Sequence, residues 1–182
     1  AGLLANLSCA AAGDAACAEQ FIREFGQKAN RRAVTENEIT RLLGVFQLGS
    51  SNGGFPHGIE LLLRAMLISP SFLFRVEVGE PVAETPGLSR PTSWEMASRL
   101  SYLLVGSLPD AELLQAAGQN ALVTKEQVLA QAQRLMEDPR ARTNIQHLHT
   151  QWFGVDEINP DKIKKDGALF PQFNDELVQL AR

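Results

Sequence analysis

One type of helix-start signature recurs three times along this chain. A threonine stands three residues before an acid or amide in each case: Thr35 with Glu38, Thr92 with Glu95, and Thr124 with Gln127. In such a capping box, each of the two side chains accepts a hydrogen bond from the other residue's backbone N–H, which satisfies amides that a helix start leaves unpaired. Three helices are therefore predicted to begin at these threonines.

Apolar residues at helical spacing follow these and other caps. Cys17, Phe21, Ile22 and Phe25 share one face of a helix that Asp14 caps. Further helices are predicted over about 36–49, 58–68, 94–106, 110–117, 125–138 and 139–155, and from about residue 174. No window alternates polar and apolar residues for long enough to predict a strand. The expected fold is all-α, a multi-helix bundle in two packed helical subdomains without a substantial sheet.

A break in this pattern divides the chain. Residues 79–91, GEPVAETPGLSRP, hold three prolines and two glycines without periodicity, which is typical of a linker. We predict an N-terminal helical unit over 1–78, a linker over 79–91 and a C-terminal helical unit over 92–182. The pattern is still helical at Arg182, so the second unit is expected to continue beyond the chain end.

The two cysteines favour an oxidising compartment. Seven residues, including Gly13 and Asp14, separate Cys9 from Cys17, so a turn can bring the two Cα atoms to disulfide distance. A bridge over so short a loop would contribute about 2–3 kcal/mol. Free buried thiols and a metal pair are the alternatives, although a structural metal site needs four ligands. A disulfide predicts a periplasmic or other extracytoplasmic location.

Charge and hydropathy exclude several classes of partner. The formal net charge of −4 argues against binding of nucleic acid. The adjacent Arg31 and Arg32 are interpreted as solvated charges at a helix end, where cations suit the helix dipole. No run of about 18 apolar residues exists to span a membrane.

The sequence predicts no catalytic, cofactor or metal site within this chain. His147 and His149 lie two residues apart and point to different faces of a helix, so they cannot chelate one metal. These two and His57 are given packing or surface roles, with His149 expected near Trp152. Phosphate-binding loops, a nucleophile elbow and the Cys-x-x-Cys-His haem signature are all missing.

Four charged residues form a predicted structural polar junction. Arg75 and Glu77 follow the aromatic pair at 72 and 74, while Glu95 and Arg99 are spaced as an i, i+4 pair on a helix. Paired charges of this kind can lock two halves together without leaving a buried ion unpaired. The alternative is a polar pocket between the halves.

Ordered motifs along nearly the whole chain indicate a family. They are Cys17-Ala18, Arg31-Arg32 with Thr35 and Glu38, Ser69 to Glu77, Glu95 to Leu104, Pro109 to Leu113, Asp138 to Ala141, and Gln151-Trp152. Together they resemble the helical domains of unknown function found in large exported bacterial proteins associated with planctomycete-type cytochrome c modules. This resemblance implies that Ser69 to Glu77 form a junction packed by Phe72 and Phe74. It also implies that any haem sits in a separate domain or partner.

Three functions follow from these observations. The first is a non-catalytic scaffold or interaction module of an exported, cytochrome-c-associated protein that serves an electron-transfer assembly. The second is a stand-alone accessory subunit of a membrane-bound electron-transfer complex, docking through apolar helices. The third is part of an enzyme completed by segments absent here, in which the residues to test would be Arg75, Glu77, Glu95, His149 and Trp152. Partners are expected to be proteins or other domains of the same parent chain.

Overall fold

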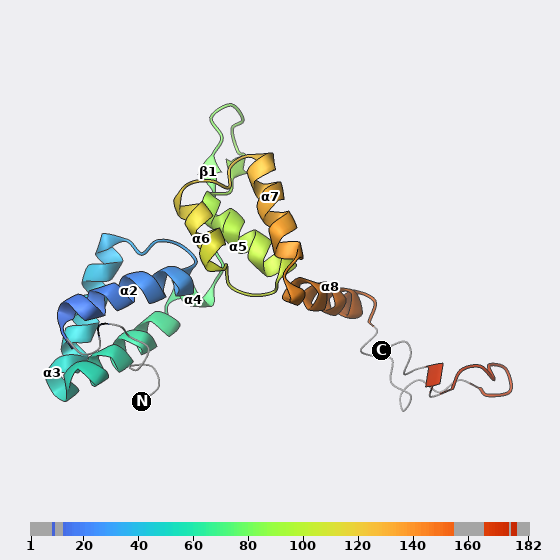
Figure 1. The fold of residues 1–182 in the computed structure, drawn as a ribbon, viewed down its shortest axis with the longest axis horizontal. Coiled ribbons are helices and arrows are strands. Elements are labelled where there is room, and N and C mark those ends of the chain that lie inside the picture. The colour runs from blue at the N-terminus through green and yellow to red at the C-terminus, as the bar shows by residue number, and fades with distance from the viewer. Residues whose placement is uncertain (1–8, 10–12, 155–165, 175, 178–182) are drawn as a thin grey trace.

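A computed structural model describes residues 9, 13–154, 166–174 and 176–177. Over these residues the chain is all-α, as predicted, apart from one two-residue ladder (Figure 1). In chain order the elements are α2 (Ala15–Asn30), α3 (Glu36–Leu67), α4 (Pro70–Leu73), β1 (Glu80–Pro81), β2 (Ser89–Arg90), α5 (Ser93–Leu104), α6 (Ala111–Gly118), α7 (Lys125–Met136) and α8 (Pro139–Trp152).

The predicted starts of α2, α3, α5, α6, α7 and α8 are confirmed, whereas the helix predicted from residue 58 is the second half of α3. All three capping boxes form, at the starts of α3, α5 and α7. Asp14 caps α2 by accepting from the N–H of Cys17 at 2.9 Å. Of the helix predicted near Asn174, only Glu176 and Leu177 are described, and both are helical; the rest lies outside the described residues.

The glycine-rich segment after residue 48 corrects one predicted boundary. The helix does not stop at Gly49, and α3 is interrupted only at Gly53 and Gly54, where Gly54 has a φ of 71°. Gly49 instead permits a close crossing between the two halves of α3. A Cβ at Gly49 would lie 2.9 Å from the Cα of Gly58, so only glycine lets the backbones approach this closely.

Two separate hydrophobic cores form on either side of residues 79–91. The first joins α2 to α3 through Ala18, Phe21, Ile22, Ile39, Phe46, Ile59, Leu62 and Met66. The second joins α5, α6 and α7 through Ala97, Leu100, Val105, Leu113, Ala117, Leu122 and Leu135. Figure 1 shows these two groups of helices side by side, with α8 extending away from the second. The proposed unit bounds themselves stay a prediction.

The predicted linker contains the short ladder. Glu80 lies opposite Arg90 and Pro81 opposite Ser89 in an antiparallel pair. Gly79 enters this pair with a φ of 70°, and a Cβ there would lie 2.7 Å from the carbonyl oxygen of Arg90. Sequence patterning missed the ladder because a two-residue strand has no periodicity to detect. Among the helices of the described residues, none is long and apolar enough to cross a membrane.

The expected disulfide is present and joins Cys9 to Cys17. Cys17 is buried in the first turn of α2, so the bridge ties the preceding chain to the N-terminal core. Replacing both cysteines with serine is expected to lower the free energy of unfolding by about 2–3 kcal/mol. Chemical denaturation of the oxidised protein and of the double variant measures this difference; an unchanged midpoint would show that the bridge does not stabilise the fold.

Candidate functional site

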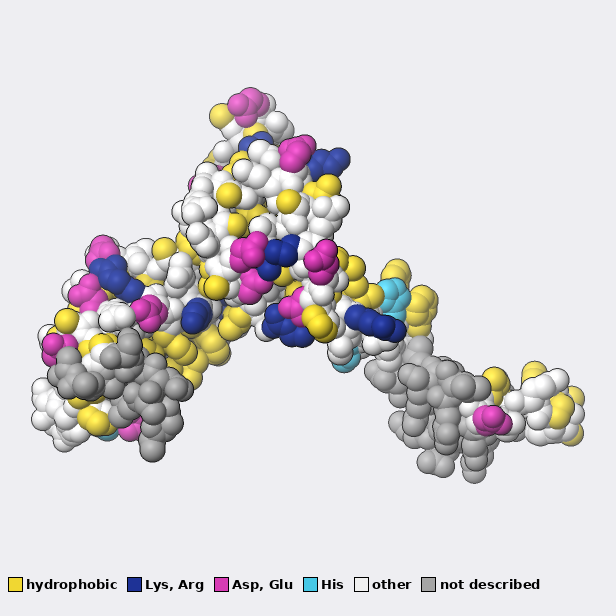
Figure 2. Space-filling view, in the orientation of Figure 1, with side chains coloured by type: hydrophobic (Ala, Val, Ile, Leu, Met, Phe, Trp, Pro, Cys, Tyr) yellow, Lys and Arg dark blue, Asp and Glu magenta, His cyan; other side chains and the backbone are white. Residues whose placement is uncertain are grey.

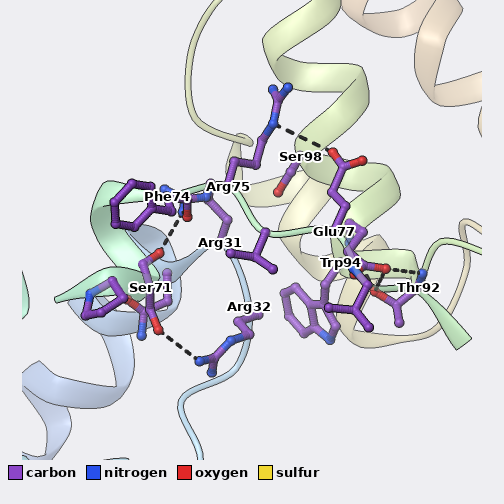
Figure 3. Close-up of a pocket in the computed structure, with 14 residues that line it drawn as sticks. Arg31, Arg32, Ser71, Phe74, Arg75, Glu77, Thr92, Trp94 and Ser98 are labelled. Carbon is purple, nitrogen blue, oxygen red and sulfur yellow. Dashed lines mark hydrogen bonds and ion pairs between the residues drawn. The ribbon is translucent and has the colours of Figure 1, made fainter.

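A pocket of about 470 Å³ lies at the junction of the two units. Its walls come from the C-terminal end of α2, from α4, from the connecting residues 74–78 and from the first turns of α5 (Figure 3). Its volume falls within the range of sites for small molecules. This junction is therefore the candidate functional site of the described chain.

Arg31 is the most deeply buried charged group at this site, which corrects its interpretation as a solvated charge. Its side chain is only 7% exposed. The guanidinium donates to the backbone carbonyls of Ser71 at 2.7 Å, Phe74 at 2.9 Å, Ala29 at 3.1 Å and Phe72 at 3.3 Å. Arg31 thus fastens the end of α2 to the turn that contains α4.

Arg32 is bound to the capping box of α3. Its guanidinium donates to both carboxylate oxygens of Glu38, at 2.8 and 2.9 Å, and to the hydroxyl of Ser71 at 3.2 Å. Glu38 also accepts from the backbone and hydroxyl of Thr35. Hydrogen bonds from Arg32, followed by those from Thr35, lower the pKa of Glu38 to about 2 despite partial burial.

The low pKa of Glu38 predicts that the free energy of unfolding decreases in acid. Because the folded protein favours the ionised form of Glu38, the stabilisation is complete above the ordinary pKa of 4.5 and is lost as the pH falls toward about 2. Glu38→Gln keeps a capping residue but removes the charge, so at neutral pH it should cost about 1 kcal/mol for this partly exposed pair. Denaturation midpoints should converge as the pH falls below 4.5; a gap that is independent of pH would contradict this role.

The carboxylate of Glu95 holds the connection between the units. One oxygen accepts from the N–H groups of Val78 at 2.7 Å and Gly79 at 3.0 Å. The other accepts from the N–H of Thr92 at 2.7 Å within the capping box of α5. Burial raises the pKa of Glu95, but these N–H donors outweigh it and lower the pKa below its usual value.

The expected ion pair between Glu95 and Arg99 is wrong, because both oxygens of Glu95 are already engaged by backbone amides. Arg99 pairs instead with Glu77, at 2.5 Å. Arg75 lies farther from Glu77, at 3.6 Å, and its guanidinium carbon lies 5.1 Å from the ring centre of Tyr102. All four predicted junction residues therefore lie at the connection. They attach the connecting residues 75–79 to α5 and do not link one helix to another.

The hydrogen bonds and ion pairs between the two units therefore all pass through the connecting residues 75–79 in the part of the chain that the structure describes. Over the described ranges, no hydrogen bond or ion pair joins residues 13–74 directly to residues 92–154. The joint is also less packed by aromatic side chains than the resemblance implied. Phe72 is half-buried, but the side chain of Phe74 is 62% exposed.

The other candidate residues lie away from the pocket. His149 stacks on Phe153, with ring centres 6.1 Å apart, and Trp152 stacks with the same Phe153 ring at 5.6 Å. His57 lies 3.5 Å from Glu60 on the exposed side of α3. Among the described residues, no group of three or more His, Cys, Asp or Glu side chains is arranged to hold a metal ion.

Sequence reasoning missed four residues of the pocket. The sequence interpretation treats Arg31 and Arg32 as solvated charges and gives no role to Trp94 or Ser98, yet all four line the pocket (Figure 3). The available signal was the position of the arginine pair directly before the capping box of Thr35 and Glu38. That position gives Arg32 a carboxylate within reach.

Two family models match the chain, and each match contains some of the residues that line the pocket. Residues 92–182 match the model of PSD4, described as a protein of unknown function (DUF1592). The chain belongs to this family. Residues 17–77 match a second model, PSD5, also described as a protein of unknown function (DUF1595). No curated protein and no solved structure matches the chain. In this PSD4 chain the arginines of the pocket lie in the PSD5 match, whereas Trp94, Glu95 and Ser98 lie in the PSD4 match.

Proposed function

We propose that this chain is a non-catalytic helical scaffold or interaction module of an exported, cytochrome-c-associated protein. Its role is to hold a haem domain, carried by the same parent chain or by a partner, within an electron-transfer assembly. The haem is supplied by that other domain. The observation on which the proposal rests is the apolar face of α8.

The apolar face of α8 begins in the protein core and continues beyond it. Ala141, Ile145, Leu148 and Trp152 follow one another at spacings of four, three and four residues, which places them on one side of the helix. Ala141 is buried and Ile145 half-buried, whereas Leu148 and Trp152 are exposed. The first half of this face packs on its own unit, and the second half is open to a partner.

Aromatic side chains dominate the open half. Trp152 is 76% exposed and Phe153 is 69% exposed, and their rings stack with centres 5.6 Å apart. Figure 2 shows hydrophobic and histidine side chains gathered at the outer end of α8. Aromatic anchors on an exposed helix face are typical of a helix that docks in an apolar groove of a partner protein.

Two further observations support the context of this proposal. The disulfide between Cys9 and Cys17 suits an extracytoplasmic compartment. The ordered motifs resemble helical domains from proteins that are associated with planctomycete-type cytochrome c modules. A haem domain is therefore the partner to test.

Photocrosslinking from the face of α8 tests this function. A benzophenone amino acid replaces Trp152 in one variant and the exposed Leu48 of α3 in a matched control, each expressed in the native host. We expect irradiation to join the Trp152 variant, but not the Leu48 variant, to a polypeptide with the absorption spectrum of haem. Adducts that lack haem, or equal adducts from both positions, would reject the cytochrome association.

The intact mass of the native protein distinguishes a haem domain on the same parent chain from one on a separate partner. A mass equal to the 182-residue chain less two hydrogens indicates a separate subunit with its disulfide formed. A much larger mass indicates one segment of a multidomain protein. In the second case the crosslink is expected within one polypeptide.

A further inference from the structure

The junction pocket contains hydrogen-bond donors that the protein itself does not use. Ser98 is only 5% exposed, and Figure 3 shows it on α5 near Glu77 and Arg75. Neither the hydroxyl of Ser98 nor the indole N–H of Trp94 has a hydrogen-bond partner among the described residues. No fully buried side-chain nitrogen or oxygen of the described residues lacks a partner, so both groups reach solvent and can donate to a ligand in the pocket.

The charges around the pocket leave a cation available. Three arginines and two glutamates line it, an excess of one positive charge. The oxygens of Glu95 are already engaged by backbone N–H groups, and Glu77 pairs with Arg99 at 2.5 Å. Arg75 lies 3.6 Å from Glu77, so it has the weaker share of that carboxylate. The guanidinium of Arg75 can turn toward a ligand without leaving a buried acid unpaired.

The remaining wall of the pocket suits an apolar body. Val76 and Val78 line it with the half-buried ring of Trp94. In Figure 3 the Trp94 ring stands across the opening from Arg32. A concave site with apolar walls and a few convergent polar groups is the usual form of a binding site for a small molecule.

We propose that this pocket binds a small organic carboxylate whose body is apolar or aromatic. Arg75 and the hydroxyl of Ser98 donate to the carboxylate, and the indole of Trp94 packs against the body. Arg31, whose donors are committed to backbone carbonyls, contributes positive potential only. The single excess charge of the pocket matches the single charge of a carboxylate. This site goes beyond the proposed scaffold function and does not depend on the face of α8.

The indole N–H resonance of Trp94 offers a direct readout. The chain has two tryptophans, so Trp152→Phe at the exposed position leaves Trp94 as the only indole signal in a nitrogen–proton correlation spectrum. The probe is 3-phenylpropionate, and its neutral twin is 3-phenylpropanamide. We expect the acid to shift the Trp94 signal saturably in the millimolar range, roughly 1–10 mM, and the amide to bind about tenfold more weakly or less well still.

Variants in the same background locate the site. Arg75→Gln and Ser98→Ala should each weaken binding of 3-phenylpropionate by about tenfold, whereas Arg142→Gln, on the exposed surface of α8, should leave it unchanged. Circular dichroism confirms that each variant is folded. Equal shifts with the acid and the amide, no saturable shift, or equal weakening by Arg142→Gln would each overturn the proposal. These results are independent of crosslinking at Trp152, so failure of one proposal does not imply failure of the other.

Discussion

Replacing Arg31 with alanine is expected to lower the free energy of unfolding of the N-terminal unit by about 3–4 kcal/mol. The substitution removes four hydrogen bonds to backbone carbonyls and leaves those carbonyls without a charged donor. It also removes the link from α2 to the turn at residues 71–74. Chemical denaturation followed by circular dichroism measures the loss, and hydrogen exchange at the Ile22 amide assigns it to this unit.

Matched substitutions separate the side chain from the backbone. Arg31 has a φ of 57°, a left-handed conformation that costs roughly 1–2 kcal/mol for residues other than glycine. Arg31→Gly should therefore be less destabilising than Arg31→Ala by about 1 kcal/mol. Arg31→Lys keeps the charge but cannot span several carbonyls with one ammonium group. If Arg31→Ala proves no more harmful than Arg142→Ala on the surface, these hydrogen bonds do not stabilise the fold.

Leu113→Ala is expected to destabilise the C-terminal unit by about 3 kcal/mol without affecting the other core. The side chain of Leu113 is fully buried among α5, α6 and α7, and its truncation leaves a cavity there. Hydrogen exchange resolves the two units. Exchange at the Leu100 amide should accelerate by roughly a hundredfold, while the Ile22 amide keeps its wild-type rate.

The reciprocal substitution completes this test of the domain prediction. Leu62 is fully buried in the core of α2 and α3, so Leu62→Ala should accelerate exchange at Ile22 and spare Leu100. The expectation follows from two cores that are linked by a short connection. If either variant accelerates exchange equally at both amides, the chain unfolds as one cooperative domain and the division at residues 79–91 is not a domain boundary.

The helices could be predicted from sequence because the signals that start them are local. A capping box is complete within four residues, and its threonine and its acid recognise each other whatever the rest of the chain does. The end of a helix is less well encoded. In the sequence Gly49 is typical of a helix end. In the structure it lies inside α3, where its missing side chain lets the backbone at Gly58, in the other half of α3, pack closely against it.

The sequence identifies the four residues of the polar junction but not the partners with which they pair. Spacing alone paired Glu95 with Arg99, although the capping box with Thr92 already engaged one oxygen of that acid. The capping-box pattern and the i, i+4 ion-pair pattern both involve the carboxylate of Glu95, and the structure contains the capping box. The role of Arg31 could not be read from the sequence at all. Three of its four acceptors are backbone carbonyls about forty residues away, and a backbone carbonyl has no residue identity to recognise.

The way in which the two units are fastened has a mechanical consequence. Arg31 clamps residues 71–74 at one end, and Glu95 clamps the amides of residues 78–79 at the other. Residues 75–77 are thus a tether between two fixed points, with two soft torsions per residue. Fully extended, these three residues span about 10 Å. We expect a pulling force to open the ion pairs that Glu77 makes with Arg75 and Arg99 before either clamp, so that the two units can reorient about a joint three residues long.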